Sequence, residues 1–416
     1  MNKSIESILT RLISIIAKFL LVTFLAKNLS LSEYGIYQLV TYFVMISVYI
    51  YGAEYYMYGN REVAKGVASL EKINTHINFF LTLLPFTFLI QFAALFFLIP
   101  NAILTPTLIA FILVINFCDY FNQEIYRYLI MVNEITKANI LLVVKSLVLL
   151  LLVLVYFFLE SEIAIESTLW LMFISYLFLL AVSFIFFQKY IVKGESIYIK
   201  LLSFSEVKRI FRFLLPFLGL MVFTKGLEFF DKFAIEQYLG ADELGIYAFL
   251  FSIASLINVF IVSGFYLVYL PKAIQLHERK SIALKACITK FALLTVVFSL
   301  ILACGEIVFI DVLLKIIGKE NLSSNVSLLY ILLGAFFFLN MSLIPRLILY
   351  VANKDKTLMS ITGILFFCNI FLNLFFLKEY GIEGAALILL ITYFIGFLIT
   401  SYKGSIEWKK ITRGFL

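Results

Sequence analysis

Ionisable side chains recur at helical spacing within two strongly apolar stretches of the chain. Arg11 and Lys18 are seven residues apart in the first stretch, so they lie two turns along one helical face. Lys225, Glu228 and Lys232 share a face of the later stretch, and Glu228 to Lys232 has the favourable order for an i,i+4 ion pair. Charges inside apolar helices indicate a polar cavity or a partner side chain.

A short repeat relates these two stretches. The segment NLSLSEYGIY, residues 28–37, matches YLGADELGIY, residues 238–247, at five of ten positions with an offset of 210. On this offset Lys18 corresponds to Glu228. Equivalent faces of a duplicated fold look toward each other across the axis that relates them. We therefore expect the two helices to line one cavity in which cations outnumber acids: Arg11, Lys18, Lys225 and Lys232 against Glu228 and Asp231.

A cavity of this charge suits an anionic group such as pyrophosphate. Arginine gives such a group forked hydrogen bonds, and lysine gives it a point charge. The alternative is that Arg11 and Lys232 extend to the lipid head groups while Glu228 only neutralises Lys232.

Further polar residues interrupt two other apolar stretches. Asn116, Asp119, Gln123 and Arg127 form a stripe that faces either the same cavity or a neighbouring helix. Arg127 joins the predicted substrate-binding set. Glu54 lies among tyrosines that indicate either an interfacial aromatic belt or a platform for sugars: Tyr51, Tyr55 and Tyr58. We interpret Glu54, Asp119, Glu228 and Asp231 as candidates for coupling to protons or sodium, and His76 and His277 as solvated residues in or beside loops.

Composition shows which elements hold these residues. Of the 416 residues, 63% are hydrophobic and 14% are charged, against about 45–50% and about 25% in soluble domains. Lipid offers backbone groups no partner, so apolar stretches long enough to cross a bilayer must be helices. We predict an all-α polytopic membrane protein with twelve spans: 8–27, 36–58, 77–99, 103–126, 139–159, 167–188, 213–238, 245–270, 288–310, 326–350, 357–377 and 382–402.

The loops between these spans predict the orientation in the membrane. On the side of the termini lie 21 lysines and arginines, and on the other side lie four: Lys27, Lys315, Lys319 and Lys378. Because positive loops stay in the cytoplasm, both termini are expected there. The net charge of +7 then reflects topology and attraction to anionic lipids, and no nucleic-acid partner is indicated.

The longest polar break divides the chain into two halves. We predict an N-terminal six-helix bundle over 1–190, a cytoplasmic linker over 191–212 and a C-terminal six-helix bundle over 213–416. Six spans separate the two copies of the repeat. Because that number is even, the halves point the same way and are related by a pseudo-two-fold axis along the membrane normal.

Motifs for catalysis or for a bound metal do not occur in the sequence. It contains no Walker A segment, no paired catalytic carboxylates in a sizeable loop and no metal-spaced cluster. The four cysteines lie singly in apolar stretches without CxxC spacing, which indicates packing residues. No enzymatic activity, catalytic residue, metal or cofactor is therefore expected.

Several segments resemble one family of transporters. They are LSEYGIY after the first span, NREVAKG after the second, YLGADELGIY after the seventh, LPKAIQLHERK after the eighth, and NLFFLKEYGIEGAALILL near the C-terminus. Together they resemble the Wzx-type polysaccharide-biosynthesis flippases of the multidrug/oligosaccharidyl-lipid/polysaccharide exporter superfamily. The resemblance implies two MATE-like six-helix bundles around a central cavity that opens alternately to each side.

The resemblance also implies a substrate and a location. The substrate would be an undecaprenyl-pyrophosphate-linked oligosaccharide that moves from the cytoplasmic to the outer leaflet of the bacterial inner membrane, in the biosynthesis of O-antigen, capsule or exopolysaccharide. Its pyrophosphate would meet Arg11, Lys18, Lys225 and Lys232. The implied partners are the lipid bilayer, a polysaccharide polymerase and a chain-length regulator. The alternatives are a drug or cation antiporter of the same superfamily and a membrane polysaccharide polymerase.

Overall fold

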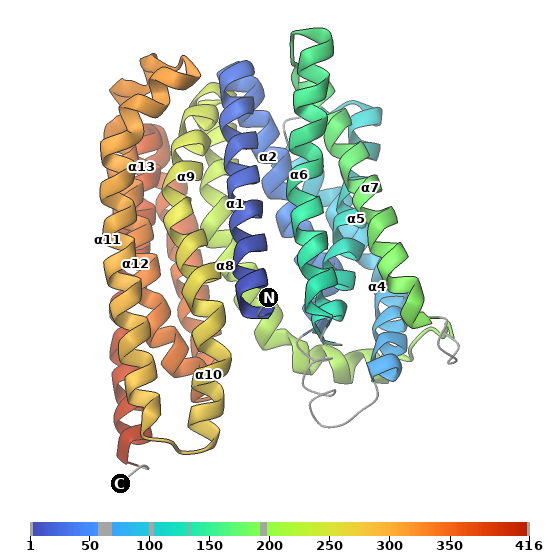
Figure 1. Ribbon diagram of the computed structural model, residues 1–416, viewed down its shortest axis with the longest axis vertical. Coiled ribbons are helices and arrows are strands. Elements are labelled where there is room, and N and C mark those ends of the chain that lie inside the picture. The colour runs from blue at the N-terminus through green and yellow to red at the C-terminus, as the bar shows by residue number, and fades with distance from the viewer. Residues whose placement is uncertain (1–2, 57–68, 100–103, 132–133, 192–197, 414–416) are drawn as a thin grey trace. The chain divides into compact units, whose positions relative to one another are not determined.

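Every regular element that the computed structural model describes is helical, as Figure 1 shows. The structure describes residues 3–56, 69–99, 104–131, 134–191 and 198–413. The chain divides into two compact units. Unit 1 consists of Met1–Leu29 and Ile36–Val222, and unit 2 consists of Ser30–Gly35 and Phe223–Leu416. The short segment Ser30–Gly35 therefore lies with the later part of the chain, not with its sequence neighbours.

Unit 1 is built from long apolar helices whose cores match the predicted spans. They are α1 (Lys3–Asn28), α2 (Leu31–Gly52, without its first turn), α4 (Ser69–Leu98), α5 (Pro106–Met131), α6 (Ile135–Glu160) and α7 (Ile165–Ile191). The main packing contacts within the unit join α1 to α6 and α5 to α7. Several of these helices extend beyond the apolar stretches that predicted them, because their polar outer turns continue the helix.

The segment predicted as the last part of the linker is helical. Helix α8 (Phe204–Leu239) begins nine residues before the predicted span, and its first part belongs to unit 1. Ser203 and Glu206 form a capping box, in which the Ser203 amide donates to the Glu206 carboxylate at 2.8 Å. The apolar face of this first part packs against Tyr55 and Phe79 through Ile210 and Leu214. Of the remaining linker, residues 192–197 lie outside the described residues.

Unit 2 contains the second part of α8 and the helices that follow. These are α9 (Ala241–Ile261), the π-helical turn η1 (Val262–Tyr266), α10 (Leu267–Glu278), α11 (Ala283–Ile317), the 3₁₀ turn η2 (Glu320–Asn325), α12 (Val326–Val351) and α13 (Asp355–Arg413). Helix α13 is broken at Gly381, which adopts φ 59° and ψ −155°. Glycine adopts this conformation without a steric penalty, and the break separates the two spans predicted at 357–377 and 382–402.

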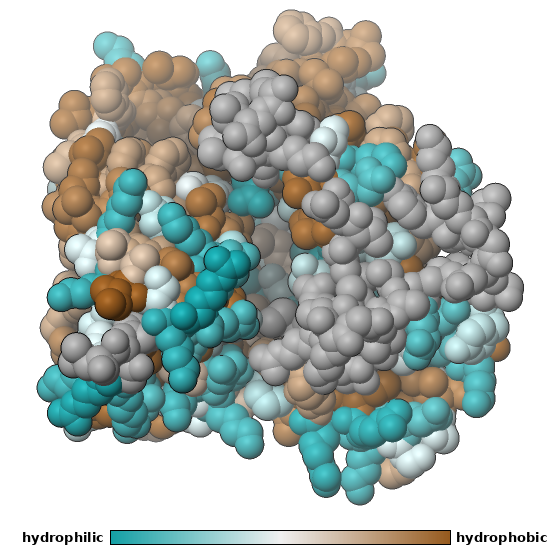
Figure 2. All heavy atoms as spheres, turned by 60° about the horizontal axis from the view of Figure 1, so that its bottom comes forward, coloured by the Kyte–Doolittle hydropathy of each residue, from teal (hydrophilic) through white to brown (hydrophobic). Residues whose placement is uncertain are grey.

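The protein is a multi-pass membrane protein with the predicted helical architecture. Ten helices in the described part of the chain are long and apolar enough to cross a bilayer, with η1 and α10 counted as parts of one helix with α9. Adding α1, which carries Arg11 and Lys18, and dividing α13 at Gly381 gives the twelve predicted spans. Figure 2 shows hydrophilic residues gathered at the end of the molecule where the turn between α10 and α11 and the end of α13 lie.

The two copies of the sequence repeat contact each other within unit 2. A Cβ added to Gly35 would collide with the backbone oxygen of Ala241, and one added to Gly245 would collide with the backbone oxygen of Leu31. The offset of 210 relates one contact to the other, since 31 corresponds to 241 and 35 to 245. The first turns of α2 and α9 therefore cross at a distance that only glycine allows.

Candidate functional site

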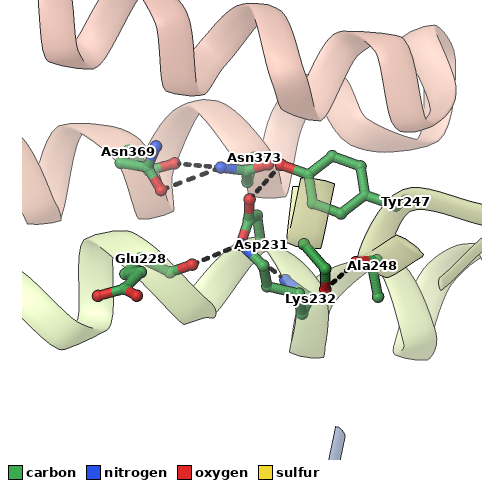
Figure 3. A network of polar contacts seen from close by, with 8 residues as sticks. Glu228, Asp231, Lys232, Tyr247, Ala248, Asn369 and Asn373 are labelled. Atoms are coloured by element: carbon green, nitrogen blue, oxygen red, sulfur yellow. Dashed lines mark hydrogen bonds and ion pairs between the residues drawn. The ribbon is translucent and has the colours of Figure 1, made fainter. Parts of the chain in front are cut away.

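An acid and a lysine are fully buried side by side on α8 in unit 2. Asp231 and Lys232 are both 0% exposed, and the Lys232 ammonium donates to Asp231 Oδ1 at 2.8 Å. The ammonium also donates to the backbone oxygen of Glu228 and lies over the Phe251 ring. The Tyr247 hydroxyl donates to the other carboxylate oxygen of Asp231, as Figure 3 shows. The two charges therefore neutralise each other, and the Glu228 backbone oxygen and the Tyr247 hydroxyl add a hydrogen bond to each member of the pair.

The favourable i,i+4 spacing of Glu228 and Lys232 does not give an ion pair between them. The Glu228 carboxylate accepts from Lys225 Nζ at 2.6 Å, one turn earlier on the same helix, while Lys232 takes Asp231. The side chains of Lys225 and Glu228 are 20% and 29% exposed, so this second pair lies nearer the surface. Helical spacing alone favoured Glu228, but burial makes Asp231 the partner because an unpaired carboxylate at 0% exposure would be costly.

Buried amides and a hydroxyl on α13 lie alongside this pair. Asn373 donates to the backbone and side-chain oxygens of Asn369 at 2.9 and 3.1 Å, and Asn369 donates to Thr392 at 3.4 Å. Figure 3 draws Asn369 and Asn373 beside Asp231. Tyr393, on the same helix, lies within electrostatic range of Glu228 and Asp231. Oxygen atoms of this kind suit a small cation, yet here the Lys232 ammonium already occupies the carboxylate.

Unit 1 also holds an acid–lysine pair, formed between two helices. Asp119 on α5 accepts a hydrogen bond from the Lys145 ammonium on α6. Asp119 is buried, whereas the Lys145 side chain is 28% exposed and its ammonium lies 5.4 Å from the centre of the Tyr176 ring on α7. Lys18 on α1 is exposed and lies within electrostatic range of both members of the pair. This cluster has two cations and one acid, so it can attract an anion.

A second polar cluster in unit 1 centres on Arg127. Its guanidinium pairs with Glu124 at 2.9 Å and with Glu54 at 3.3 Å, and it lies over the Tyr56 ring. Glu54 is 3% exposed and has φ 56°, a left-handed conformation that is unusual for a residue other than glycine. Arg11 lies within electrostatic range of Tyr126, the neighbour of Arg127 on α5. Two carboxylates thus neutralise Arg127, which leaves it less charge for a ligand.

The interpretation of His76 as a solvated loop residue is wrong. His76 lies within α4, where its ring stacks on Tyr55 at 4.4 Å between centroids. Its Nε2 is 3.1 Å from the Tyr120 hydroxyl and 3.7 Å from Glu124. The helix begins at Ser69, before the apolar stretch, so hydropathy alone placed this histidine outside the membrane helices.

The tyrosines near Glu54 belong to the protein core. Tyr51 and Tyr55 are 1% and 2% exposed, and they pack against Phe80, Tyr120 and Phe79. The interfacial-belt interpretation is therefore wrong for both, and neither is available as a sugar platform in this conformation. Tyr58 lies outside the described residues.

The polar stripe on α5 makes contacts between helices of unit 1. Asn116 donates to Gln91 at 3.2 Å, and Gln91 donates to the backbone oxygen of Ser47 at 3.0 Å. Asp119 pairs with Lys145, and Arg127 pairs with Glu54 and Glu124, as described above. Of the predicted site residues, those of the first half thus lie in two clusters of unit 1, and those of the second half in one cluster of unit 2. That the two sets share one cavity stays a prediction.

Several residues of these clusters were missing from the predicted site. They are Lys145, Glu124 and His76 in unit 1, and Tyr247, Asn369 and Asn373 in unit 2. The i,i+4 spacing of Asn369 and Asn373 in an apolar stretch, and the place of Tyr247 in the repeat, are signals that point to them. Lys145 stands alone in its apolar stretch, so only its tertiary partner reveals the pair.

One described cavity contains none of these residues. It has a volume of about 270 Å³ and lies between α12 and the last part of α13. Its lining is mainly apolar and comprises Met341, Ile344, Pro345, Ile348, Phe397, Ser401, Gly404, Ser405 and Trp408. Within the described residues no group of three or more histidine, cysteine, aspartate or glutamate side chains is placed to hold a metal ion.

Comparisons with known proteins reveal the fold. No protein family and no curated protein matches the chain by sequence. An inward-facing multidrug resistance MATE transporter of the MOP superfamily is 12% identical, with a TM-score of 0.74 over 97% of this chain and 96% of that one. The lipid II flippase MurJ in an inward closed conformation is 15% identical, with a TM-score of 0.72 over 99% and 90%.

A further match is an outward-facing MATE transporter of the same superfamily, at 13% identity and a TM-score of 0.65 over 99% of this chain and 97% of that one. The solved structures named here are thus all transporters or flippases. At these identities the likeness concerns architecture. The chain has the fold that MATE transporters and the flippase MurJ share.

Proposed function

We propose that this protein is a flippase for polyprenyl-pyrophosphate-linked oligosaccharides. It moves undecaprenyl-pyrophosphate-linked repeat units from the cytoplasmic to the outer leaflet of the bacterial inner membrane, for the synthesis of a surface polysaccharide. Both termini lie in the cytoplasm, where the loops carry most of the positive charge. The two halves, over residues 1–190 and 213–416, act as the moving bundles.

The cationic cluster of unit 1 is the observation that carries the proposal. Lys18 and Lys145 face a single acid, Asp119, and Lys145 keeps part of its side chain exposed. A membrane protein that moved only cationic drugs would have little use for surplus positive charge among its helices, because like charges repel such a substrate. A pyrophosphate, in contrast, gains charge-assisted hydrogen bonds there. The fold, which this chain shares with the lipid II flippase MurJ, supports the same conclusion.

Transport follows an alternating-access cycle. The head group enters from the cytoplasmic side and is held by Arg11, Lys18, Lys225 and Lys232 with Arg127, while the polyprenyl tail stays in lipid. In the described conformation Lys232 is 0% exposed and bound to Asp231, so it reaches a substrate only after that pair opens.

The buried acids are the candidates for ion coupling. Glu54, Asp119 and Asp231 are each buried and paired with a cation, whereas Glu228 is partly exposed beside Lys225. A proton or sodium ion that displaced the lysine from Asp231 would free that lysine and link ion binding to substrate binding.

A drug or cation antiporter is the second candidate, because the MATE transporters that share the fold include multidrug resistance proteins. A polysaccharide polymerase is a weaker alternative. Cells that lack this protein should be complemented with the wild type, Lys18→Gln, Lys145→Gln, their double variant and the control Lys285→Gln, whose residue is exposed outside these clusters. Surface polysaccharide and drug resistance are then measured separately.

We expect the double variant to lose surface polysaccharide while Lys285→Gln retains it, at equal protein levels in the membrane. Retained polysaccharide in the double variant would remove these lysines from the substrate path. Loss of drug resistance without loss of polysaccharide would favour the antiporter.

A further inference from the structure

Arg346 on α12 is an arginine without an acidic partner among the described residues. It is half-buried, and its Nε atom is buried without a hydrogen-bond partner. No described carboxylate lies within ion-pair distance of its guanidinium. The sequence gives no hint of this, because the arginine simply follows Pro345 in an apolar stretch.

Four other cations of the membrane helices are paired with carboxylates. Arg127 has Glu54 and Glu124, and the three lysines each have one carboxylate: Lys145 with Asp119, Lys225 with Glu228, and Lys232 with Asp231. A guanidinium withdrawn from water without a counter-ion is costly. The Arg346 guanidinium therefore has a positive charge and an Nε donor without a described partner, and an anion from outside the chain would bind both.

The surroundings of Arg346 show where that anion would lie. Tyr266 in the π-helical turn η1 and Tyr393 on α13 both lie within electrostatic range of the guanidinium. Tyr350, one turn further along α12, is near Tyr266. Tyr393 is 7% exposed and also in range of Asp231, so the arginine is directed toward the interior of unit 2. A side chain that extended to lipid head groups would point away from these groups.

Among the described residues, the acids in range of Tyr393 do not oppose an anion at this place. The acids in range of Tyr393 are Glu228 and Asp231, and each already has a lysine. Tyrosine hydroxyls donate hydrogen bonds to phosphate oxygens, and a guanidinium offers them a planar fork. Short π-helical segments such as the one that carries Tyr266 are frequent at functional sites.

We propose that Arg346 binds a phosphate group of the transported lipid, with Tyr266 and Tyr393 as additional donors. This inference rests on the proposed function and adds a contact in unit 2 that lies outside the set predicted from the sequence. Arg346 lies five residues before the end of α12, on the side of the membrane where the termini are predicted. The site is therefore placed to take the diphosphate as the substrate arrives from the cytoplasm.

The test measures binding of defined lipids to the purified full chain in nanodiscs of uncharged phospholipid. Undecaprenyl diphosphate and undecaprenol differ only in the phosphates, and inorganic pyrophosphate supplies the phosphates without the lipid. The variants are Arg346→Gln and Arg346→Lys, with Arg279→Gln as the matched control, since Arg279 is exposed at the end of α10. Thermal unfolding of each variant checks that it is folded.

We expect Arg346→Gln to weaken undecaprenyl diphosphate binding by about tenfold or more, which corresponds to one lost charge-assisted contact. Arg346→Lys keeps the charge and loses the fork, so its loss should be smaller. Undecaprenol binding and the Arg279→Gln variant should be unchanged within twofold. Equal affinity of wild type and Arg346→Gln for undecaprenyl diphosphate would overturn the proposal, as would an equal loss for undecaprenol.

The two proposals fail in different ways. If Arg346→Gln weakens binding of inorganic pyrophosphate while the wild type fails to restore surface polysaccharide, the anion site stands and the flippase assignment falls. If the wild type restores surface polysaccharide and Arg346→Gln binds and transports equally well, the flippase stands and the role of Arg346 falls.

Discussion

Each unit buries an acid against a lysine, but the two pairs are built differently. In unit 2, Asp231 and Lys232 are neighbours on α8, and both are withdrawn from solvent. In unit 1, Asp119 and Lys145 come from different helices, and Lys145 is 28% exposed. Tyr247 binds Asp231 directly.

The repeat-equivalent tyrosine of unit 1 is Tyr37. Tyr176 is within electrostatic range of both Tyr37 and Asp119. A sealed pair holds its own helix in place and exchanges partners only when the surrounding helices move. A pair between two helices with one exposed member can exchange its carboxylate for another anion without such movement. The comparison therefore predicts that an anion reaches the pair of unit 1 directly, whereas it reaches the pair of unit 2 only after a conformational change.

Breaking the sealed pair should give the largest effect. Lys232→Met leaves Asp231 buried without a cation, and removing one member of a buried ion pair costs about 3–5 kcal/mol. We expect a large decrease in the midpoint of thermal unfolding of the purified protein in detergent. The double variant Asp231→Asn/Lys232→Met, which leaves no buried charge, should recover much of the loss.

The matched variant in unit 1 is Lys145→Met. Because solvent reaches this pair, its removal should lower the unfolding midpoint less than Lys232→Met does. Equal losses in the two units would contradict the distinction between a sealed and an open pair.

The repeat tyrosines sharpen the comparison. Tyr247→Phe removes a hydrogen bond to a buried carboxylate, for which we expect a loss of about 1.5–3 kcal/mol. For Tyr37→Phe we expect the smaller loss of a neutral hydrogen bond, roughly 0.5–1.5 kcal/mol, because the Asp119 carboxylate of unit 1 pairs with Lys145. Urea-induced unfolding in mixed micelles would measure both. A larger loss of stability for Tyr37→Phe than for Tyr247→Phe would contradict this difference between the two units.

Where the repeat copies touch, the comparison predicts equality. Gly245→Val places a side chain against the backbone oxygen of Leu31, and Gly35→Val places one against that of Ala241. Backbone cannot move aside as a flexible side chain can, so each variant should lose about 1–3 kcal/mol. Gly305→Ala is the control, because nothing lies within 4 Å of an added Cβ there. Thermal unfolding of the three variants checks this, and unequal losses for the two valines would contradict a symmetric crossing.

Sequence patterns sufficed for the helices but only partly for the site. Long apolar stretches predicted the spans because lipid leaves backbone groups no partner, and the glycine at 381 marks the break in α13. Polar outer turns were not predicted, since Ser69–His76 of α4 and Phe204–Arg212 of α8 lie beyond the apolar stretches. For that reason His76 was misplaced.

Partners of charged residues depend on tertiary contacts that spacing along one helix does not contain. Helical spacing favoured Glu228 as the partner of Lys232, whereas in the structure the partner is the buried Asp231. The same limit hid the pairing of Lys145 and the lack of an acid beside Arg346. Residue type therefore identified charged helices, while the three-dimensional contacts decide which charges remain available to a ligand.

The smallest effect is expected at the partly exposed pair of α8. Lys225 and Glu228 lie one turn from the sealed pair and are 20% and 29% exposed. Exposed pairs at i,i+3 contribute about 0.2–0.5 kcal/mol, because water screens them and their side chains lose freedom on pairing. Lys225→Ala should therefore leave the unfolding midpoint nearly unchanged, although it removes the same formal charge as Lys232→Met. If Lys225 also contacts the substrate, the variant reduces transport of lipid-linked oligosaccharide at unchanged stability, whereas a substantial loss of stability would mean that burial does not distinguish the two lysines of α8.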